Sequence, residues 1–552
     1  MQSTMDNQRL ILLLVFFFSC MMLWDAWQRK DLPPPTATSQ SASITPAAGS
    51  TPGSAAVPSA PTAAVTPGPV PTGNAGGVGG VSAAQAPVLK IRTDLVNAEV
   101  SAQGGDLVRL ELLKHQAHEK PDQLFVLLDP AHAYAAQSGL IGTGLPNHKS
   151  LWKLPAESME LKAGDSELRV PLEAALQGGG KVVKTYVFKR GNYLVDVEHK
   201  FVDVPVPAGT YAYYQLTRDD KSPDGSGGAM STATFTGAAI YTDQEKFKKV
   251  DFGDFGGKNK HPTAADNGWV AMVQHYFFSA WIPAGGEREY FTRKIDGNLY
   301  AAGIVVPFAG DNLVMPLYAG PQEQDKLEKI APGLELVVDY GWLTFIAAPL
   351  FWVLEWIYKL VGNWGWAIIG LTILIKAAFF PLSAASYKSM AKMRVLTPKL
   401  MKLKETYADD KQRMNQEMME LYKREKVNPL GGCLPILVQI PVFIALYWVL
   451  LGTVEMRGAP WLGWITDLSV QDPYYVLPLI MGVSMFVQTK LNPTPPDPIQ
   501  AKIVLWMPII FTGMFLFFPA GLVLYWTVNN ALSIAQQWQV NRMIESAGLK
   551  AH

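Results

Sequence analysis

The sequence predicts a multi-domain membrane protein with an α-helical membrane core of five C-terminal spans, an N-terminal anchor helix and a large β-sandwich domain. Three observations support this fold class. A short apolar run lies near the N-terminus, and the middle of the chain carries short runs that alternate in polarity. The C-terminal part is far more apolar than the rest, although the mean hydropathy of the 552 residues is only +0.10. This length is enough for several domains.

The first apolar run, residues 10–24, predicts an anchor helix. It follows Arg9 and is not followed by the small residues of a cleavage site. Cys20 leaves open a lipoprotein, in which the cysteine is lipidated after cleavage. The bulky Phe17 and Phe18 favour instead an uncleaved span of about 20 residues.

Residues 31–87 consist mainly of Pro, Ala, Gly, Ser and Thr, with almost no charge. Such a segment cannot bury a core, and we interpret it as a flexible linker.

Residues 88–335 predict a β-sandwich, because short runs with period-two alternation are separated by Gly and Pro. Tyr193, Val195 and Val197 alternate with polar or smaller neighbours. Similar runs occur at residues 185–188 and 269–278.

We find no pattern of catalytic or metal-binding residues in this domain, and expect neither an enzyme nor a cofactor. The two cysteines, Cys20 and Cys433, lie in apolar runs and exclude a disulfide framework. The net charge of zero gives no reason to expect direct nucleic-acid binding. The histidines lack metal-ligand spacing; they are His115, His118, His132, His148, His199, His261 and His275.

The C-terminal part predicts five spans. They cover residues 364–382, 430–451, 474–489, 503–518 and 522–540. An earlier apolar run at 341–360 contains Pro349, Glu355 and Lys359. These charges fit better with an amphipathic helix lying along the membrane surface than with a span.

The distribution of charge predicts the topology. The segment between residues 382 and 430 contains eleven Lys and Arg but only six acidic residues, whereas residues 452–473 contain a single base, Arg457. Short loops rich in Lys and Arg stay in the cytoplasm. Because the chain changes sides at every span, a cytoplasmic segment 384–429 places the β-sandwich outside and both chain termini inside, with six spans in the membrane. The predicted division of the chain is 1–30, 31–87, 88–335, 336–361, 362–383, 384–429, 430–541 and 542–552.

The basic segment 384–429 predicts two antiparallel helices with a Met-rich seam, the first kinked at Pro398. A packed hairpin without a partner explains the pattern as well as an adaptable surface for apolar ligands does. The residues that we single out for such a surface are Met390, Met393, Arg394, Met414 and Met418.

Lys376 is the one charge well inside the apolar part of the five spans, and none of the other spans offers an acidic partner. A buried charge in a membrane is costly and usually faces protein or water at a functional site. We therefore expect a wet cavity that attracts an acidic group; a lysine that snorkels to the nearby cytoplasmic surface is the alternative. Polar residues that could line this cavity, or instead form interhelical hydrogen bonds, are Thr372, Gln439, Gln488, Asn529, Asn530 and Ser533.

Long stretches of the sequence resemble the YidC family of membrane insertases. The matching stretches are residues 338–342, 362–365, 381–382, 389–394, 410–413, 425–433, 472–475 and 521–526, with 104–106 and 274–276 in the β-sandwich. The resemblance covers the chain outside the linker.

The resemblance implies a bacterial inner-membrane protein with a periplasmic, mutarotase-like sandwich. Its five spans form a hydrophilic groove that is open to the cytoplasm and to lipid but closed toward the periplasm. Lys376 takes the position of the groove charge, which is Arg in many relatives, and Thr372 and Trp526 take positions that contact the client, where Tyr often replaces the tryptophan. The implied partners are nascent membrane proteins, the Sec translocon with its accessory subunits, the ribosome and the lipid bilayer.

Two other functions have less support. A solute transporter predicts inverted repeats or paired broken helices, and the sequence has neither. An envelope enzyme acting on glycans would need a catalytic site in the β-sandwich, where we find none. The chain also lacks an ATP-binding motif.

Overall fold

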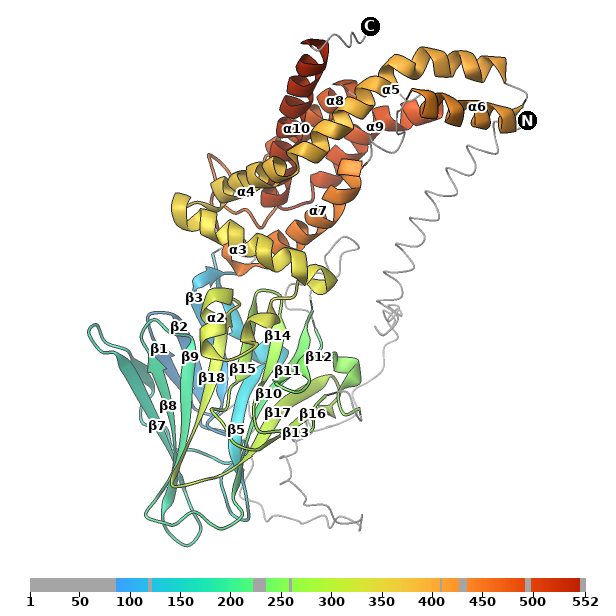
Figure 1. Ribbon diagram of the computed structural model, residues 1–552. Coiled ribbons are helices and arrows are strands. Elements are labelled where there is room, and N and C mark those ends of the chain that lie inside the picture. The colour runs from blue at the N-terminus through green and yellow to red at the C-terminus, as the bar shows by residue number, and fades with distance from the viewer. Residues whose placement is uncertain are drawn as a thin grey trace, which may run out of the picture. The chain divides into compact units, whose positions relative to one another are not determined.

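The computed structural model describes residues 86–117, 122–221, 235–257, 261–407, 410–425, 434–491 and 498–546. The predicted anchor, the predicted linker up to residue 85, both cysteines and His118 lie outside these residues. The chain divides near residue 338 into a β unit and a helical unit, and each is described by itself (Figure 1).

The β unit consists of a ten-stranded and an eight-stranded sheet. The first has the order β13-β16-β17-β10-β5-β3-β2-β1-β6, with β4 beside β3, and the second the order β12-β11-β14-β15-β18-β9-β8-β7. The strands are β1 (Val88–Arg92), β2 (Val96–Ser101), β3 (Leu107–Gln116), β4 (Leu124–Leu128), β5 (Ala135–Ile141), β6 (Ser158–Glu160), β7 (Glu167–Ala175), β8 (Lys181–Lys189), β9 (Leu194–Val202), β10 (Tyr211–Asp219), β11 (Gly237–Thr242), β12 (Lys246–Val250), β13 (Ala264–Ala265), β14 (Trp269–Gln274), β15 (Phe277–Trp281), β16 (Arg288–Asp296), β17 (Leu299–Pro307) and β18 (Asn312–Pro321). A short helix, α2 (Gln324–Ile330), follows the last strand.

The predicted β-sandwich is confirmed, and the alternation in the sequence follows its burial. In β9, Val195, Val197 and Phe201 are buried, whereas their neighbours are half-buried or exposed. The run 269–278 is not one strand: β14 and β15 form a hairpin that turns between residues 274 and 277. Both strands are buried throughout, so their hydropathy does not mark the turn.

The helical unit contains eight long helices among the described residues. They are α3 (Thr344–Val361), α4 (Trp364–Ala378), α5 (Phe380–Thr406), α6 (Lys411–Arg424), α7 (Leu434–Gly452), α8 (Val476–Leu491), α9 (Pro498–Phe515) and α10 (Ala520–Ser546). Gly362 ends α3 with a left-handed backbone (φ 69°), and the side chain of Asn363 caps α4 by accepting a hydrogen bond from the amide of Trp366.

The predicted span 364–382 is bent. The axis of α4 and that of residues 380–389 of α5 differ by 61°, and Phe379 is the joint. Pro381 lies in the first turn of α5, where a missing N–H costs no helical hydrogen bond. The bend lies three residues after Lys376.

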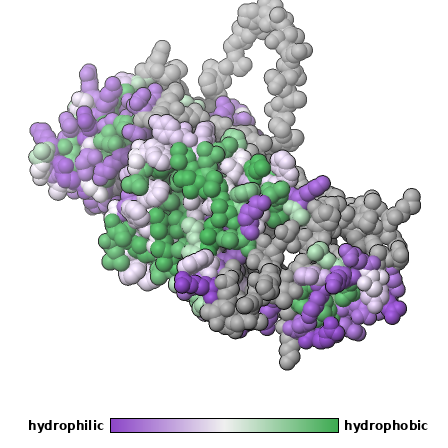
Figure 2. Space-filling model, turned by 90° about the horizontal axis from the view of Figure 1, so that it is seen from above, coloured by the Kyte–Doolittle hydropathy of each residue, from purple (hydrophilic) through white to green (hydrophobic). Residues whose placement is uncertain are grey.

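Among the described helices, α3 alone is long and apolar enough to cross a membrane unbroken, and α4 with the start of α5 passes the same test as a bent pair. Shorter apolar stretches lie in α7, α8 and α9. Large apolar side chains on α8 and α9 are exposed, among them Val483, Trp506 and Ile510. Figure 2 shows such residues gathered on a broad apolar face of the molecule.

The helices α5 and α6 pack as the predicted hairpin. Leu396, Leu400 and Leu421 are its buried centre, and Met393 and Met418 pack against them with Leu403 and Tyr422. Met414 is half-buried, whereas the side chains of Met390 and Arg394 lie outside the described residues. Two further methionines, Met401 and Met419, leave about half of their surface exposed, at 49% and 52%.

Candidate functional site

A stripe of polar side chains runs along one face of α10. Its members are Asn529, Asn530, Ser533, Gln536 and Gln537, spaced by three or four residues as one helical face requires. Four of them are largely buried, and Gln536 is half-buried. Because α10 packs against α4, α7 and α8, this stripe makes the interior of the bundle polar.

Lys376 in the last turn of α4 reaches this stripe. Its ammonium group donates a hydrogen bond to the hydroxyl of Ser533 at 2.8 Å, and Ser533 in turn donates to the carbonyl of Asn529 at 2.7 Å. Lys376 is only 8% exposed. In the part of the chain that the structure describes, no carboxylate pairs with this lysine. The cation is therefore held by a neutral hydroxyl.

Neighbouring helices complete the polar interior. Gln439 of α7 donates to the side-chain oxygen of Asn529 at 2.5 Å, and Asn530 donates to the hydroxyl of Ser484 of α8 at 3.1 Å. The amide of Gln536 donates to the backbone carbonyl of Lys376 at 3.3 Å. This carbonyl belongs to the last turn of α4, whose carbonyls lose their usual partners at the bend.

A small cavity adjoins Lys376. It is lined by Ile375, Lys376, Phe379, Leu382, Ser383, Val438 and Gln439, and its volume of about 10 Å³ accommodates roughly one water molecule. The predicted interior is polar as expected, but in this conformation it is nearly filled by side chains. A further segment of polypeptide fits into this interior only if the helices separate or if side chains are displaced.

The structure connects four of the predicted residues by hydrogen bonds, namely Lys376, Gln439, Asn529 and Ser533, and places Asn530 beside them on the same stripe. Thr372 is buried one turn before Lys376, and its hydroxyl donates to the carbonyl of Ile368 in its own helix. Trp526 lies in an aromatic cluster with Phe443 of α7 and Phe511 and Phe515 of α9.

Three residues of the polar interior are missing from the prediction: Ser484, Gln536 and Gln537. The two glutamines follow Ser533 by three and four residues, so helical periodicity could have identified them. Ser484 offers no such signal, because a serine in an apolar helix often bonds its own backbone, as Ser484 also does with the carbonyl of Met481.

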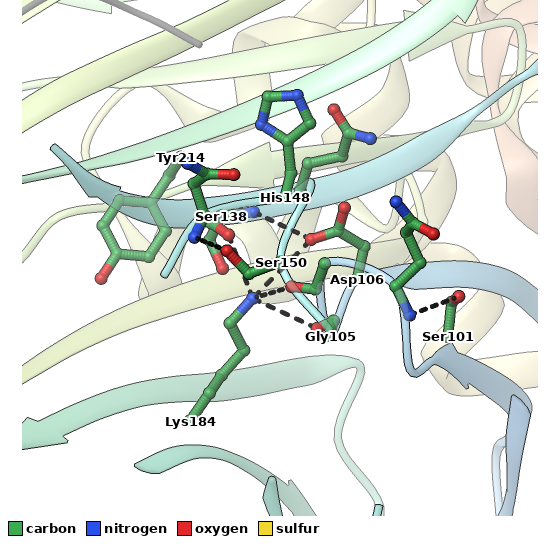
Figure 3. Close-up of polar contacts among 12 residues, drawn as sticks. Ser101, Gly105, Asp106, Ser138, His148, Ser150, Lys184 and Tyr214 are labelled. Carbon is green, nitrogen blue, oxygen red and sulfur yellow. Dashed lines mark hydrogen bonds and ion pairs between the residues drawn. The ribbon is translucent and has the colours of Figure 1, made fainter. Parts of the chain in front are cut away.

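A second buried polar cluster lies in the β unit (Figure 3). The ammonium group of Lys184 on β8 donates to the carbonyls of Gly104, Gly105 and Ser138 at 2.8, 3.2 and 3.0 Å, and lies 3.7 Å from the carboxylate of Asp106. Lys184 is fully buried. It therefore joins the eight-stranded sheet to the turn before β3 and to β5 of the other sheet.

The geometry of this cluster is that of a structural tie rather than of a catalytic site. Burial raises the pKa of Asp106 to about 7, because desolvation outweighs the opposing attraction of Lys184. His148 nearby shares a hydrogen bond with Tyr213 and is also buried. The described residues contain no group of side chains that could hold a metal ion.

Comparison with known proteins gives family matches over both units. Residues 356–547 match the family described as 60Kd inner membrane protein, and residues 88–353 match the YidC periplasmic domain. A membrane protein insertase YidC from Aromatoleum aromaticum is 60% identical over 98% of both chains, and one from Dechloromonas aromatica is 56% identical over 99% of both.

Solved structures give weaker matches. An active YidC insertase crystal structure with the first transmembrane domain resolved is 18% identical, with a TM-score of 0.40 over 82% of this chain and 94% of that one. A galactose mutarotase-like protein from Lactobacillus casei is 9% identical, with a TM-score of 0.29 over 42% of this chain and 99% of its own.

A helical membrane core with a polar interior, joined to a β-sandwich, and the full-length similarity to insertases define the class of protein: an inner-membrane insertase with a periplasmic domain. The chain belongs to the YidC family. The expected family and fold class are thus confirmed.

Proposed function

We propose that the chain inserts nascent membrane proteins by offering the acidic part of a client a temporary partner at Lys376. The observation that carries this proposal is a buried cation held by the hydroxyl of Ser533. A carboxylate interacts with an ammonium group more strongly than a neutral hydroxyl does. A client carboxylate can therefore displace Ser533 and be released again when its segment moves on.

The work of the polar interior is solvation rather than covalent chemistry. Polar and charged groups are expensive to place in hydrocarbon without partners. The amides of Gln439, Asn529 and Asn530 supply donors and acceptors at this depth. They lower the cost of carrying a hydrophilic client segment past the apolar layer, while its apolar helix passes into lipid beside the bundle.

The proposed topology has six spans, with both termini and the hairpin α5–α6 in the cytoplasm. Parity then places α3 along the periplasmic surface, although its length would allow it to cross. Trp352 and Trp356 are exposed on α3, and Glu355 pairs with Lys359 at 2.8 Å. Aromatic and charged residues of this kind favour the membrane interface.

The hairpin is the proposed receiving surface for clients, which arrive from the ribosome. Met401 and Met419 are exposed on it, and methionine side chains adapt to varied apolar surfaces. The Sec translocon and its accessory subunits are further proposed partners. Driving force comes from client hydrophobicity, the membrane potential or these partners.

Site-specific photocrosslinking to a stalled nascent chain tests the proposal. A photoreactive residue at position 372, 439 or 533 should crosslink to a client while its acidic segment is crossing. The same residue at position 510, which is 64% exposed on the lipid-facing side of α9, is the control. Equal crosslinking at the control and at the three interior positions would contradict a client path through the polar interior.

A further inference from the structure

The loop between α7 and α8 ends in Asp472-Pro473-Tyr474-Tyr475, which the proposed mechanism does not use. Asp472 is fully buried at 0% exposure, although most of its neighbours in the loop are not. One carboxylate oxygen accepts hydrogen bonds from the indole N–H of Trp464 at 2.9 Å and from the amide of Tyr474 at 3.0 Å. The other accepts from the amide of Leu477 at 2.7 Å.

These bonds fix the start of α8. Leu477 is the second residue of that helix, so the carboxylate satisfies an amide that has no partner inside the helix. Tyr475 has a left-handed backbone with φ of +57°, a conformation that residues other than glycine rarely adopt. The carboxylate holds the backbone on both sides of this residue.

The same loop contacts the start of α10. The amides of Ala520 and Gly521, at the start of α10, donate to the carbonyls of Val470 and Leu468 at 2.7 and 2.9 Å. These bonds lie within four residues of Asp472 along the chain. The short segment 468–477, which contains Asp472, therefore links the start of α8 to the start of α10.

The start of α4 is tied to the other end of this loop. Asn363 donates to the carbonyl of Pro460 at 2.9 Å. The ring of Trp461 lies so close to Gly365 that a side chain there would meet it at 2.1 Å. The amides of Trp461 and Leu468 in turn bond carbonyls within the loop, so that it forms one compact cap.

We propose that Asp472 is a positioning residue for insertion, which keeps the periplasmic ends of α4, α8 and α10 together and so prevents the polar interior from opening to the periplasm. This inference rests on the proposed topology, which places residues 453–475 outside. Toward the other end of the bundle, single side-chain hydrogen bonds from Gln536 and Gln537 link α10 to the carbonyls of Lys376 on α4 and Leu491 on α8.

The test measures access to the interior from the periplasm. Cys20 and Cys433 are replaced by serine, Asn529→Cys supplies a thiol in the polar interior, and a membrane-impermeant maleimide is added to intact spheroplasts. We expect slow labelling in this background and labelling at least about fivefold faster with Asp472→Ala. Insertion of a client with a translocated tail, measured without the Asn529 change, should fall several-fold.

Asp467→Ala is the matched control. This aspartate lies on the same loop but accepts hydrogen bonds only locally, from the amide and the hydroxyl of Ser469, and its replacement should leave labelling and insertion unchanged. If the Asp472→Ala protein does not accumulate, the same labelling is measured with Trp464→Phe, which removes only one of the hydrogen bonds to the carboxylate. We expect an intermediate rate for it.

Slow labelling and normal insertion in a stable Asp472→Ala or Trp464→Phe variant would overturn the positioning role and leave the proposed function intact. Rapid labelling already in the background protein would instead contradict the proposed closure toward the periplasm, whatever Asp472 does. A rise in labelling with unchanged insertion would also overturn the role in insertion, because the seal would then be irrelevant to it.

Discussion

Replacement of Lys376 by glutamine, and then by glutamate, tests whether its charge acts on the client. At 4 Å, two opposite unit charges attract by about 1 kcal/mol in water and by about 4 kcal/mol at an effective dielectric constant near 20. Lys376 is 8% exposed and adjoins a cavity for roughly one water molecule. Its surroundings are therefore closer to the second case.

These energies translate into rates of insertion. Because about 1.4 kcal/mol is a factor of ten, loss of the charge in Lys376→Gln should slow an acidic-tailed client by a factor between about five and about a thousand. Lys376→Glu should slow it further, because attraction becomes repulsion. A client with a neutral tail should insert at nearly the same rate in all three proteins.

The assay is protease protection of the translocated tail in vesicles that contain equal amounts of each variant. Lys490→Gln is the matched control, since this exposed lysine lies in the last turn of α8 and over the ring of Phe486 rather than inside the bundle. An acidic-tailed client that inserts equally well with the wild-type protein and with a stable Lys376→Glu variant refutes the electrostatic reasoning.

Two further predictions concern the stability of each unit. Lys184→Met should destabilise the β unit by about 3–5 kcal/mol at pH 8, because it leaves the carboxyl group of Asp106 and several carbonyls buried without their partner. Asp106→Asn should cost only about 1 kcal/mol, and equal losses in urea unfolding at this pH would contradict the lysine as the centre of the cluster. Gly365→Ala should lower the melting temperature of the detergent-solubilised chain, since the added carbon would lie 2.1 Å from the ring of Trp461 and overpacking costs about 1–3 kcal/mol. Gly513→Ala is the control: its added carbon meets nothing within 4 Å in α9, so this variant should be neutral or slightly stabilising. Similar melting temperatures of the two variants would contradict the contact between Gly365 and Trp461.

Much of the architecture could be predicted because strands and helices differ in the periodicity of their apolar residues. Alternation marked strands such as β9, and a Met-rich stripe of period 3.6 marked the seam between α5 and α6. The sequence does not show that the run 269–278 is divided into the two strands of a hairpin, β14 and β15. Both of its strands are buried on both faces, and the turn at His275 and Tyr276 contains neither glycine nor proline.

The sequence predicts most of the residues of the polar interior, but not which of them form hydrogen bonds with one another. Lys376 stood out because its charge lies in an apolar helix, but the sequence does not show that Ser533 accepts its hydrogen bond. Nor does it show the 61° bend after Lys376, because Phe379 is not a helix breaker and Pro381 is compatible with a helix start. Asp472 was visible only as part of a motif, since burial of a loop aspartate depends on distant segments.

In the proposed mechanism, the hydrogen bond between Lys376 and Ser533 affects the residence time of a client. A group that bound its passenger very tightly would stall each cycle at the moment of release, and turnover would fall as affinity rose. Because the hydroxyl of Ser533 stands ready to take back the ammonium group at 2.8 Å, a departing carboxylate leaves behind a satisfied lysine rather than a bare one. In the proposed mechanism, the site thus returns to its resting hydrogen bond after each client, as repeated use requires.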